Sequence, residues 1–120
     1  MARFRLSRPA QADLAQVLAT STERWGSETK GRYAALIAAA MKMVAAEPEG
    51  SATRDRPELQ PGIRSFHIRH ARSKVAGEKV RKPVHVIYFR VVQPGLIEIV
   101  RLLHERMLPS SYIGSETDES

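Results

Sequence analysis

The sequence predicts an α+β fold: an N-terminal strand, an antiparallel helical hairpin and then a three-stranded antiparallel meander, with the helices packed on one face of the sheet. Two observations lead to this prediction. In the first half of the chain, apolar residues recur at intervals of three and four, as on the buried face of a helix. In the second half, three segments rich in β-branched and aromatic residues are separated by turn-forming residues. A length of 120 residues favours one domain, expected over residues 1–113.

The opening residues predict a short strand followed by a helix. Residues 3–6 alternate basic and apolar side chains, which is typical of a strand. Ser7 is a candidate N-cap, and Pro9 suits the first helical turn because its missing N–H is not needed there. Gly26 is expected to end this helix. The residues that follow at helical spacing are Leu14, Val17, Leu18, Ser21 and Trp25.

The second helix carries the clearest periodic signal. Ser27 is expected to cap it, and Pro48 and Gly50 are expected to end it. Because only Gly26 and Ser27 separate the two helices, they are predicted to form an antiparallel hairpin. Trp25 is expected to pack against the second helix. The apolar stripe of this helix consists of Tyr33, Leu36, Ile37, Ala40, Met41 and Val44.

Three strands are predicted after a loop over residues 48–62. The first lies near Ile63–Arg69, with Phe66 and Ile68 facing inward, and a basic loop over residues 70–83 follows it.

The last two strands are predicted to form a β-hairpin. Residues 84–92 are apolar on both faces, as in a central strand. Gln93, Pro94 and Gly95 form the expected turn, and Leu96 to His104 form the last strand.

Composition limits the classes of protein to which the chain can belong. It has no cysteine, which excludes disulfides, thiolate metal sites and a cysteine nucleophile. No segment is typical of an export signal or is long and apolar enough to span a bilayer, so we expect a soluble, cytoplasmic protein with no membrane contact. Residues 114–120 carry three acids and no base, and they are expected to be a disordered acidic tail.

The charge of the chain is +6 and is unevenly placed. Residues 64–82 contain seven Arg or Lys and one acid, Glu78. Such a basic segment attracts polyanions, and three kinds of partner are open: nucleic acid, the ribosome or an acidic protein. A role in solubility alone is the remaining interpretation.

No catalytic or nucleotide-binding motif is present, and no cofactor is expected. The histidines His67, His70, His85 and His104 have no carboxylate or third ligand at a useful spacing, so no metal site is expected. A further group lies at the end of the last strand and on its expected neighbours. Its side chains could hold an RNA phosphate and transfer protons, bind an acidic protein, or form only a solvated strand face. The group consists of Arg101, His104, Arg106 and Tyr112, with Arg64, Arg69 and Tyr88.

Five segments, in order and with similar gaps, resemble the ParE-type toxins of the RelE/ParE superfamily. Phe4–Leu14 resembles the opening strand and the pattern Leu-Ser-x-x-Ala-x-x-Asp-Leu, and Glu23–Gly26 matches the turn of the helical hairpin. Arg56–Phe66 is similar to the segment Arg-Pro-Glu-Leu-x-Pro-Gly-Leu-Arg-Ser-Phe. Val86–Val91 resembles the strand Val-Ile-Tyr-Tyr-Arg-Val, and Ile97–Met107 resembles the ending Val-Glu-Ile-Val-Arg-Val-Leu-His-x-Arg-Met. The loop over residues 70–83 departs from the family by being longer and more basic.

The resemblance implies a type II toxin–antitoxin system. It implies a toxin that poisons DNA gyrase, is not itself an enzyme, and is neutralised by a ParD-like antitoxin. Operator DNA would then be contacted only indirectly, through the antitoxin, and the pair would serve in plasmid stabilisation.

Two other functions remain open at this point. A RelE-like relative would cleave mRNA in the ribosome, with Arg64, Tyr88, Arg101 and His104 as its candidate catalytic residues. A non-toxic relative would act only as an antitoxin partner or co-repressor.

Residues are assigned to the two contacts of a gyrase poison as follows. Truncation before Arg106 is expected to abolish toxicity but not folding. The residues expected to carry toxicity are Arg101, His104, Arg106 and Met107. Those expected to bind the antitoxin are Arg24, Arg32, Arg64 and Arg69.

Overall fold

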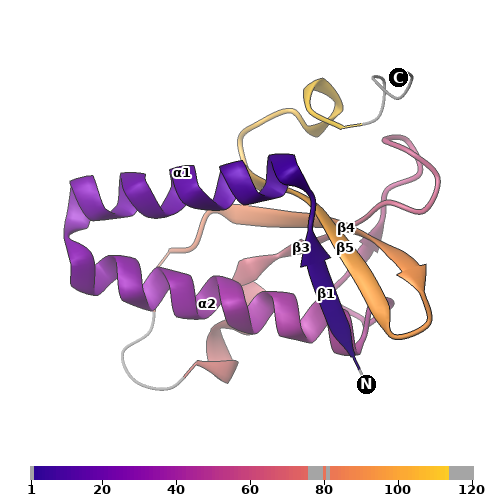
Figure 1. The fold of residues 1–120 in the computed structure, drawn as a ribbon, viewed down its shortest axis with the longest axis horizontal. Coiled ribbons are helices and arrows are strands. Elements are labelled where there is room, and N and C mark those ends of the chain that lie inside the picture. Colours follow the sequence, from indigo (N-terminus) through magenta and orange to yellow (C-terminus); the bar gives the residue numbers. More distant parts are fainter. Residues whose placement is uncertain (1, 76–79, 81, 114–120) are drawn as a thin grey trace.

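Two helices, α1 (Arg8–Trp25) and α2 (Ser27–Ala46), form an antiparallel hairpin over one face of a five-stranded sheet in the computed structural model (Figure 1). The strand order is β1-β5-β4-β3-β2. This arrangement confirms the expected α+β class. The strands span Arg3–Leu6 (β1), Arg54–Asp55 (β2), Arg64–His67 (β3), His85–Gln93 (β4) and Leu96–His104 (β5).

The structure describes residues 2–75, 80 and 82–113, and for Trp25 it describes the backbone but not the side chain. The expected packing of Trp25, the expected disorder of residues 114–120 and part of the expected loop over residues 70–83 therefore lie outside the described residues. None of the described helices is long and apolar enough to cross a lipid bilayer.

The first strand makes the sheet mixed, because β1 pairs in parallel with β5. The pairings of β3 with β4 and of β4 with β5 are antiparallel as expected, and β2, which was not predicted, also pairs antiparallel with β3. The parallel direction of β1 was not predicted from the sequence. Local sequence patterns carry no information on this direction, because β1 meets a distant part of the chain: Ser7, which follows β1, bonds to Val100, 93 positions away.

The helix ends agree with the sequence prediction at Ser7 but not at Ser27. The Ser7 hydroxyl accepts a hydrogen bond from the Ala10 N–H (3.1 Å) and donates one to the Val100 carbonyl (2.7 Å). At the hairpin turn, Gly26 takes a left-handed conformation (φ +89°) and is itself the N-cap of α2, without a side-chain capping bond. Ser27 is the first helical residue, because a glycine can make this turn in a single position.

The segment after β3 is helical where a strand end and a loop are expected. β3 ends at His67, and a 3₁₀ helix, η1 (Ile68–Lys74), follows it. The His67 Nδ1 accepts a hydrogen bond from the Arg69 N–H (3.1 Å) and so caps this helix. Ile68 and Ala71 are three positions apart, lie on one side of the 3₁₀ helix, and are buried. The two-residue strand β2 inside the expected loop is too short to produce a sequence pattern.

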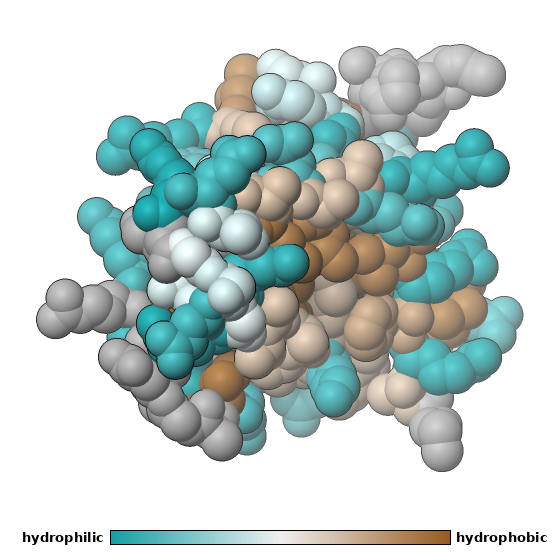
Figure 2. Space-filling model, turned by 60° about the vertical axis from the view of Figure 1, so that its left-hand side comes forward, coloured by the Kyte–Doolittle hydropathy of each residue, from teal (hydrophilic) through white to brown (hydrophobic). Residues whose placement is uncertain are grey.

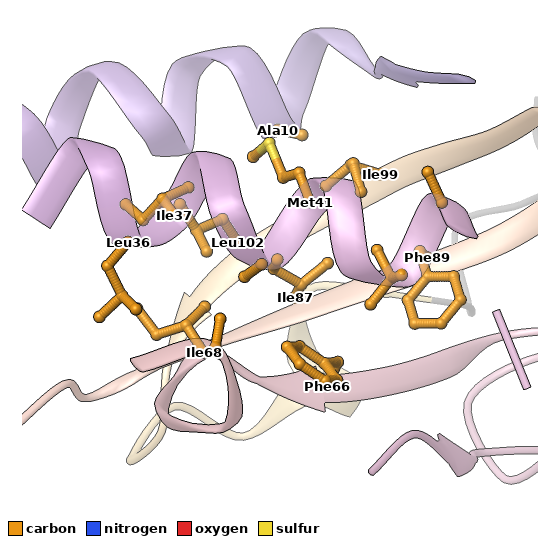
Figure 3. Packing of buried hydrophobic residues seen from close by; sticks show 14 of the residues in the cluster. Ala10, Leu36, Ile37, Met41, Phe66, Ile68, Ile87, Phe89, Ile99 and Leu102 are labelled. Atoms are coloured by element: carbon orange, nitrogen blue, oxygen red, sulfur yellow. The ribbon is translucent and has the colours of Figure 1, made fainter. Parts of the chain in front are cut away.

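The main core lies between the helical hairpin and the sheet (Figure 3). The predicted stripe of α2 is buried at all six positions, and the inward-facing Phe66 and Ile68 are buried as expected. On α1, Ser21 is buried, whereas Leu14, Val17 and Leu18 are only half-buried. The residues that the sheet contributes to this core include Ile87, Phe89, Ile97, Ile99 and Leu102.

The sheet also has a second, smaller cluster, which the sequence did not predict. It contains Leu59, Ile63, Tyr88, Leu103 and Ile113. Ile113, only 3% exposed, comes from the segment that follows β5. Truncation before Arg106 would remove this residue and uncover its neighbours, so the expectation that such a truncation leaves folding intact is not supported.

Candidate functional site

A cleft of about 540 Å³ opens between α1, the start of β4 and the end of β5. We call it the α1–β5 cleft. Its apolar lining consists of Val17, Val84, Leu102, Leu103 and Met107. Its polar lining includes Asp13, Ser21, Arg24, Tyr33, Lys82, His85, Arg101, His104 and Tyr112. Seen from the end where the hairpin turns, the apolar surface of the molecule forms a band between hydrophilic side chains (Figure 2).

The cleft forms because β1 borders only the first half of β5, and α1 lies along the edge of the second half. β1 pairs only with the first half of β5, from Leu96 to Ile99. Beyond that point, side chains at the start of α1 bind the exposed backbone: Ser7 bonds to the Val100 carbonyl, and the Asp13 carboxylate accepts from the Leu102 N–H (3.0 Å). The first turns of α1 are thus fixed to β5, and its later turns form one wall of the cleft.

Arg101 joins β5 to α1 through a bidentate ion pair. Its Nε and Nη2 each lie 2.8 Å from a carboxylate oxygen of Asp13. The two side chains are only 19% and 14% exposed, so the pair is shielded from solvent. The Arg101 guanidinium also lies over the Tyr112 ring, 5.3 Å from its centroid. Most of the Arg101 charge is therefore neutralised within the protein.

His85 is held at the base of the cleft by Tyr33 of α2. The Tyr33 hydroxyl accepts a hydrogen bond from the Val84 N–H (3.1 Å) and lies 2.7 Å from the His85 Nδ1. We assign the hydroxyl as the donor to Nδ1, which places the proton of the His85 ring on Nε2. Burial, together with nearby His104 and His67, lowers the pKa of His85 from 6.5 to about 4, so the ring is neutral at pH 7.

His104 is fixed beside His85 in the same tautomer. Its Nδ1 accepts a hydrogen bond from the Arg106 N–H (3.1 Å), which leaves the proton on Nε2. The two rings stand edge to face, with 5.5 Å between their centroids. On β3, the strand next to β4, His67 donates a hydrogen bond to Glu105 (2.7 Å). This hydrogen bond lowers the pKa of the Glu105 carboxyl.

The segment after β5 exposes apolar side chains at the mouth of the cleft. Met107, Leu108 and Tyr112 are 42%, 64% and 42% exposed. A short 3₁₀ helix, η2 (Pro109–Ser111), lies between them, and the buried Ile113 holds the segment against the sheet. The apolar surface is thus presented on an anchored element.

The structure does not gather the four residues considered for ribonuclease chemistry into one site. Arg101 is paired with Asp13, and Tyr88 is buried in the second cluster, with the Arg56 guanidinium 5.8 Å from its ring centroid. Arg64 donates to the Pro48 carbonyl (3.0 Å) and to the Thr53 hydroxyl (2.9 Å). Of the four, Arg101 and His104 line the cleft.

The four residues expected to bind the antitoxin are also dispersed over the fold. Arg24 lines the α1–β5 cleft, and Arg32 lies on the first turns of α2, where it bonds to Thr29 (3.2 Å). Arg69 is exposed on η1, and Arg64 lies on β3. Of the residues expected to carry toxicity, Arg101, His104 and Met107 line the cleft, and Arg106 is exposed next to it.

Sequence reasoning missed four residues of the cleft: Asp13, Tyr33, Lys82 and His85. A signal was present for His85, because it alternates with Ile87 and Phe89 and must face the helices, where a polar ring needs a partner. The partners themselves come from other elements and have no local signal. Among the described residues, no group of three or more His, Cys, Asp or Glu is placed to hold a metal ion.

Comparison with known proteins identifies the family. Residues 4–109 match the family model of the ParE toxin of the type II toxin–antitoxin system parDE. Toxin ParE1 of Caulobacter vibrioides is 32% identical over 115 residues, which cover 95% of this chain and 100% of the relative. Toxin ParE1 of Mycobacterium tuberculosis H37Rv is 30% identical over 105 residues, which cover 88% of this chain and 91% of the relative.

A solved structure agrees with this assignment at the level of the fold. A chain of the chromosomal ParDE TA system from P. aeruginosa superposes with a TM-score of 0.62 at 21% identity, covering 87% of this chain and 96% of that one. The family model spans most of the elements that build the α1–β5 cleft, from β1 to the end of β5. The chain therefore belongs to the ParE toxin family of type II toxin–antitoxin systems.

Proposed function

We propose that this toxin arrests growth by binding DNA gyrase, and that a ParD-like antitoxin prevents this by covering the same surface. The observation that carries the proposal is the anchored segment after β5. Met107, Leu108 and Tyr112 expose apolar surface beside a cleft that contains Arg24 and Lys82. Exposed apolar side chains next to polar and charged ones are typical of a protein–protein interface.

The four residues assigned to toxicity then divide into two roles. Arg106 and Met107 are exposed and would contact the target directly. Arg101 and His104 would position that segment, Arg101 through Tyr112 and Asp13, and His104 through the Arg106 backbone.

The antitoxin would associate through charge as well as apolar contact. Arg24, at the cleft, and Arg32, on the adjacent turns of α2, would attract an acidic antitoxin segment, and Arg64 and Arg69 would extend the attraction over the sheet side. Recognition of operator sequences would belong to the antitoxin. In this proposal the toxin acts by binding and not by catalysis, which is supported by the dispersal of the four candidate ribonuclease residues, of which only Arg101 and His104 share the cleft.

The test combines purified toxin, gyrase and supercoiled plasmid, and measures the cleaved DNA that gyrase retains. The double variant Met107→Ser/Leu108→Ser should retain far less cleaved DNA than the wild type, because it removes the exposed apolar contact. The matched control is Val91→Ser/Val92→Ser, a pair that is exposed on β4 (47% and 38%) outside the cleft lining. The cognate antitoxin should abolish the effect of the wild type.

The result that would overturn this assignment of the surface is equal activity of the Met107/Leu108 variant and the wild type. If the wild-type toxin has no effect on gyrase, the target assignment fails, and ribosome-dependent mRNA cleavage becomes the next assay. A toxin that is blank in both assays is a non-toxic antitoxin partner.

A further inference from the structure

Among the described residues that line it, the α1–β5 cleft has several hydrogen-bond donors but only one carboxylate, and that carboxylate is engaged. Asp13 accepts two hydrogen bonds from Arg101 and one from the Leu102 N–H. The cationic side chains of the lining are Arg24, Lys82 and Arg101. A ligand that carries a positive charge would therefore meet net repulsion in the cleft, whereas an anion would be attracted.

The two imidazoles are donors as well, because of how their other nitrogen atoms are used. The Nδ1 of His104 accepts a hydrogen bond from the Arg106 N–H, and the Nδ1 of His85 lies 2.7 Å from the Tyr33 hydroxyl, which is assigned as its donor. With these assignments each ring carries a proton on Nε2, and neither Nε2 meets a hydrogen-bond acceptor among the described residues. The two rings therefore place two N–H donors side by side in a partly enclosed cleft.

The remaining lining restricts the class of anion. Val17, Leu102 and Leu103 provide apolar walls, and Met107 extends them to the mouth of the cleft. Such walls suit an aliphatic body and offer little to the polar sugar–phosphate chain of a nucleic acid. The exposed Lys82 supplies a cation to the same lining, and it makes no ion pair with a carboxylate among the described residues.

We propose that the α1–β5 cleft is a receptor for a carboxylate carried on an apolar protein segment: the Nε2–H groups of His85 and His104 bind the carboxylate, Lys82 balances its charge, and the apolar walls hold the neighbouring aliphatic side chains. The proposal rests on the proposed function in naming the antitoxin as the source of that segment. Within the antitoxin, it predicts an acidic residue flanked by aliphatic ones at this contact.

The first experiment uses the toxin alone, so it does not depend on gyrase or on the antitoxin. Sodium hexanoate, a carboxylate on an aliphatic chain, is titrated into ¹⁵N-labelled protein at pH 7, and the imidazole ¹⁵N resonances are followed. The Nε2 signals of His85 and His104 should shift and saturate with hexanoate, whereas neutral hexanamide should leave them unchanged. Inorganic phosphate should bind more weakly than hexanoate. Equal response to hexanamide, or no response to hexanoate, would overturn the proposal.

Two pairs of variants assign the effect to the named donors. His104→Gln retains a side-chain N–H donor and a carbonyl that can accept from the Arg106 N–H, whereas His104→Met has no donor. Hexanoate affinity should fall about tenfold in His104→Met and be largely retained in His104→Gln. Lys82→Met should weaken binding about threefold, while Lys42→Met, which removes the same charge from α2 outside this cleft, should not. Equal affinity of the two His104 variants would overturn the role of that donor.

The last arm identifies the source of the carboxylate. The cognate antitoxin should displace hexanoate, and its affinity for the toxin should fall in His104→Met and Lys82→Met but not in Lys42→Met. If hexanoate binds and the antitoxin does not displace it, the cleft is a receptor for another acid and the antitoxin assignment is overturned. The gyrase assay is independent of this outcome, so failure of the gyrase proposal and failure of the carboxylate proposal are distinguishable.

Discussion

Side chains of the α1–β5 cleft are held in place by hydrogen bonds and ion pairs to residues of other elements. Asp13 illustrates this, because it binds the Arg101 guanidinium and a backbone N–H of the same strand. Tyr33 is a second example, because the contact of its hydroxyl with Nδ1 holds the His85 ring in place. Burial raises the pKa of that hydroxyl. Arg101, for which the sequence left phosphate binding, binding of an acidic protein and solvent exposure open, joins β5 to α1 through Asp13.

The buried His85 makes the stability of the fold depend on pH. In the folded chain burial holds the pKa of His85 at about 4, while an unfolded chain has the ordinary value of 6.5. The unfolded state therefore binds more protons below pH 6.5, and the free energy of unfolding should fall as the pH drops from 6.5 towards 4, by roughly 3 kcal/mol in total. Urea unfolding of wild type and His85→Gln at several pH values measures this.

The wild type and His85→Gln share the carboxylates that titrate in acid and the nearby groups, so the difference between their pH profiles reports on His85. The nearby groups are Asp13, Glu105, Lys82, Arg24 and His104. The variant should lose less stability than the wild type between pH 6.5 and 4. Parallel pH profiles for the two proteins would show that His85 does not carry the effect.

At the level of elements, the sequence predicted what depends on neighbours along the chain. The buried stripe of α2, the cap at Ser7 and the β4–β5 hairpin all follow from local spacing, and the structure has them where expected. The direction of β1 and the two-residue β2 depend on pairing with distant residues and were missed. The 3₁₀ helix η1 was missed because Ile68 and Ala71 together suit either a strand end or a helical turn.

The two candidate helix caps provide a matched test of the element boundaries. Ser7→Ala should lower the free energy of unfolding by about 1–2 kcal/mol, because it removes the capping bond to Ala10 and the bond to Val100. Ser27→Ala should change it by less than about 0.5 kcal/mol, because Gly26 is the cap and Ser27 makes no capping bond. Urea unfolding of both variants decides the point, and similar losses at the two serines would contradict the boundary found here.

On the scale of the whole molecule, the two faces of the sheet are covered in different ways. The helical hairpin covers one face with the main core, and a smaller cluster closes the other with Leu59, Ile63 and Ile113. Because Ile113 comes from the segment that exposes Met107 and Leu108, the proposed binding surface and the closure of the second face belong to one piece of chain. The sequence showed the segment's family resemblance, but not this anchoring.

The anchor at Ile113 can be tested without truncation. Ile113→Ala should lower the free energy of unfolding by about 2–3 kcal/mol, because the side chain is 3% exposed and packs against Tyr88 and Leu103. Leu108→Ala, which changes a leucine of the same segment that is 64% exposed, should cost less than about 0.5 kcal/mol. Equal stability of Ile113→Ala and the wild type would show that the anchor does not contribute to folding.

The position of β5 in the sheet also affects the order in which the toxin can assemble. β5 lies between β1 and β4, and the bond from Ser7 to Val100 spans 93 positions. Contacts of this separation require closure of a large loop before they stabilise anything, so they form slowly. A growing chain that ends before Leu96 can contain the helical hairpin and β2 to β4, but it lacks β5, which joins β1 to β4, and therefore also the α1–β5 cleft. During translation, the surface proposed to bind the gyrase and the antitoxin can therefore form only after the final strand has been synthesised.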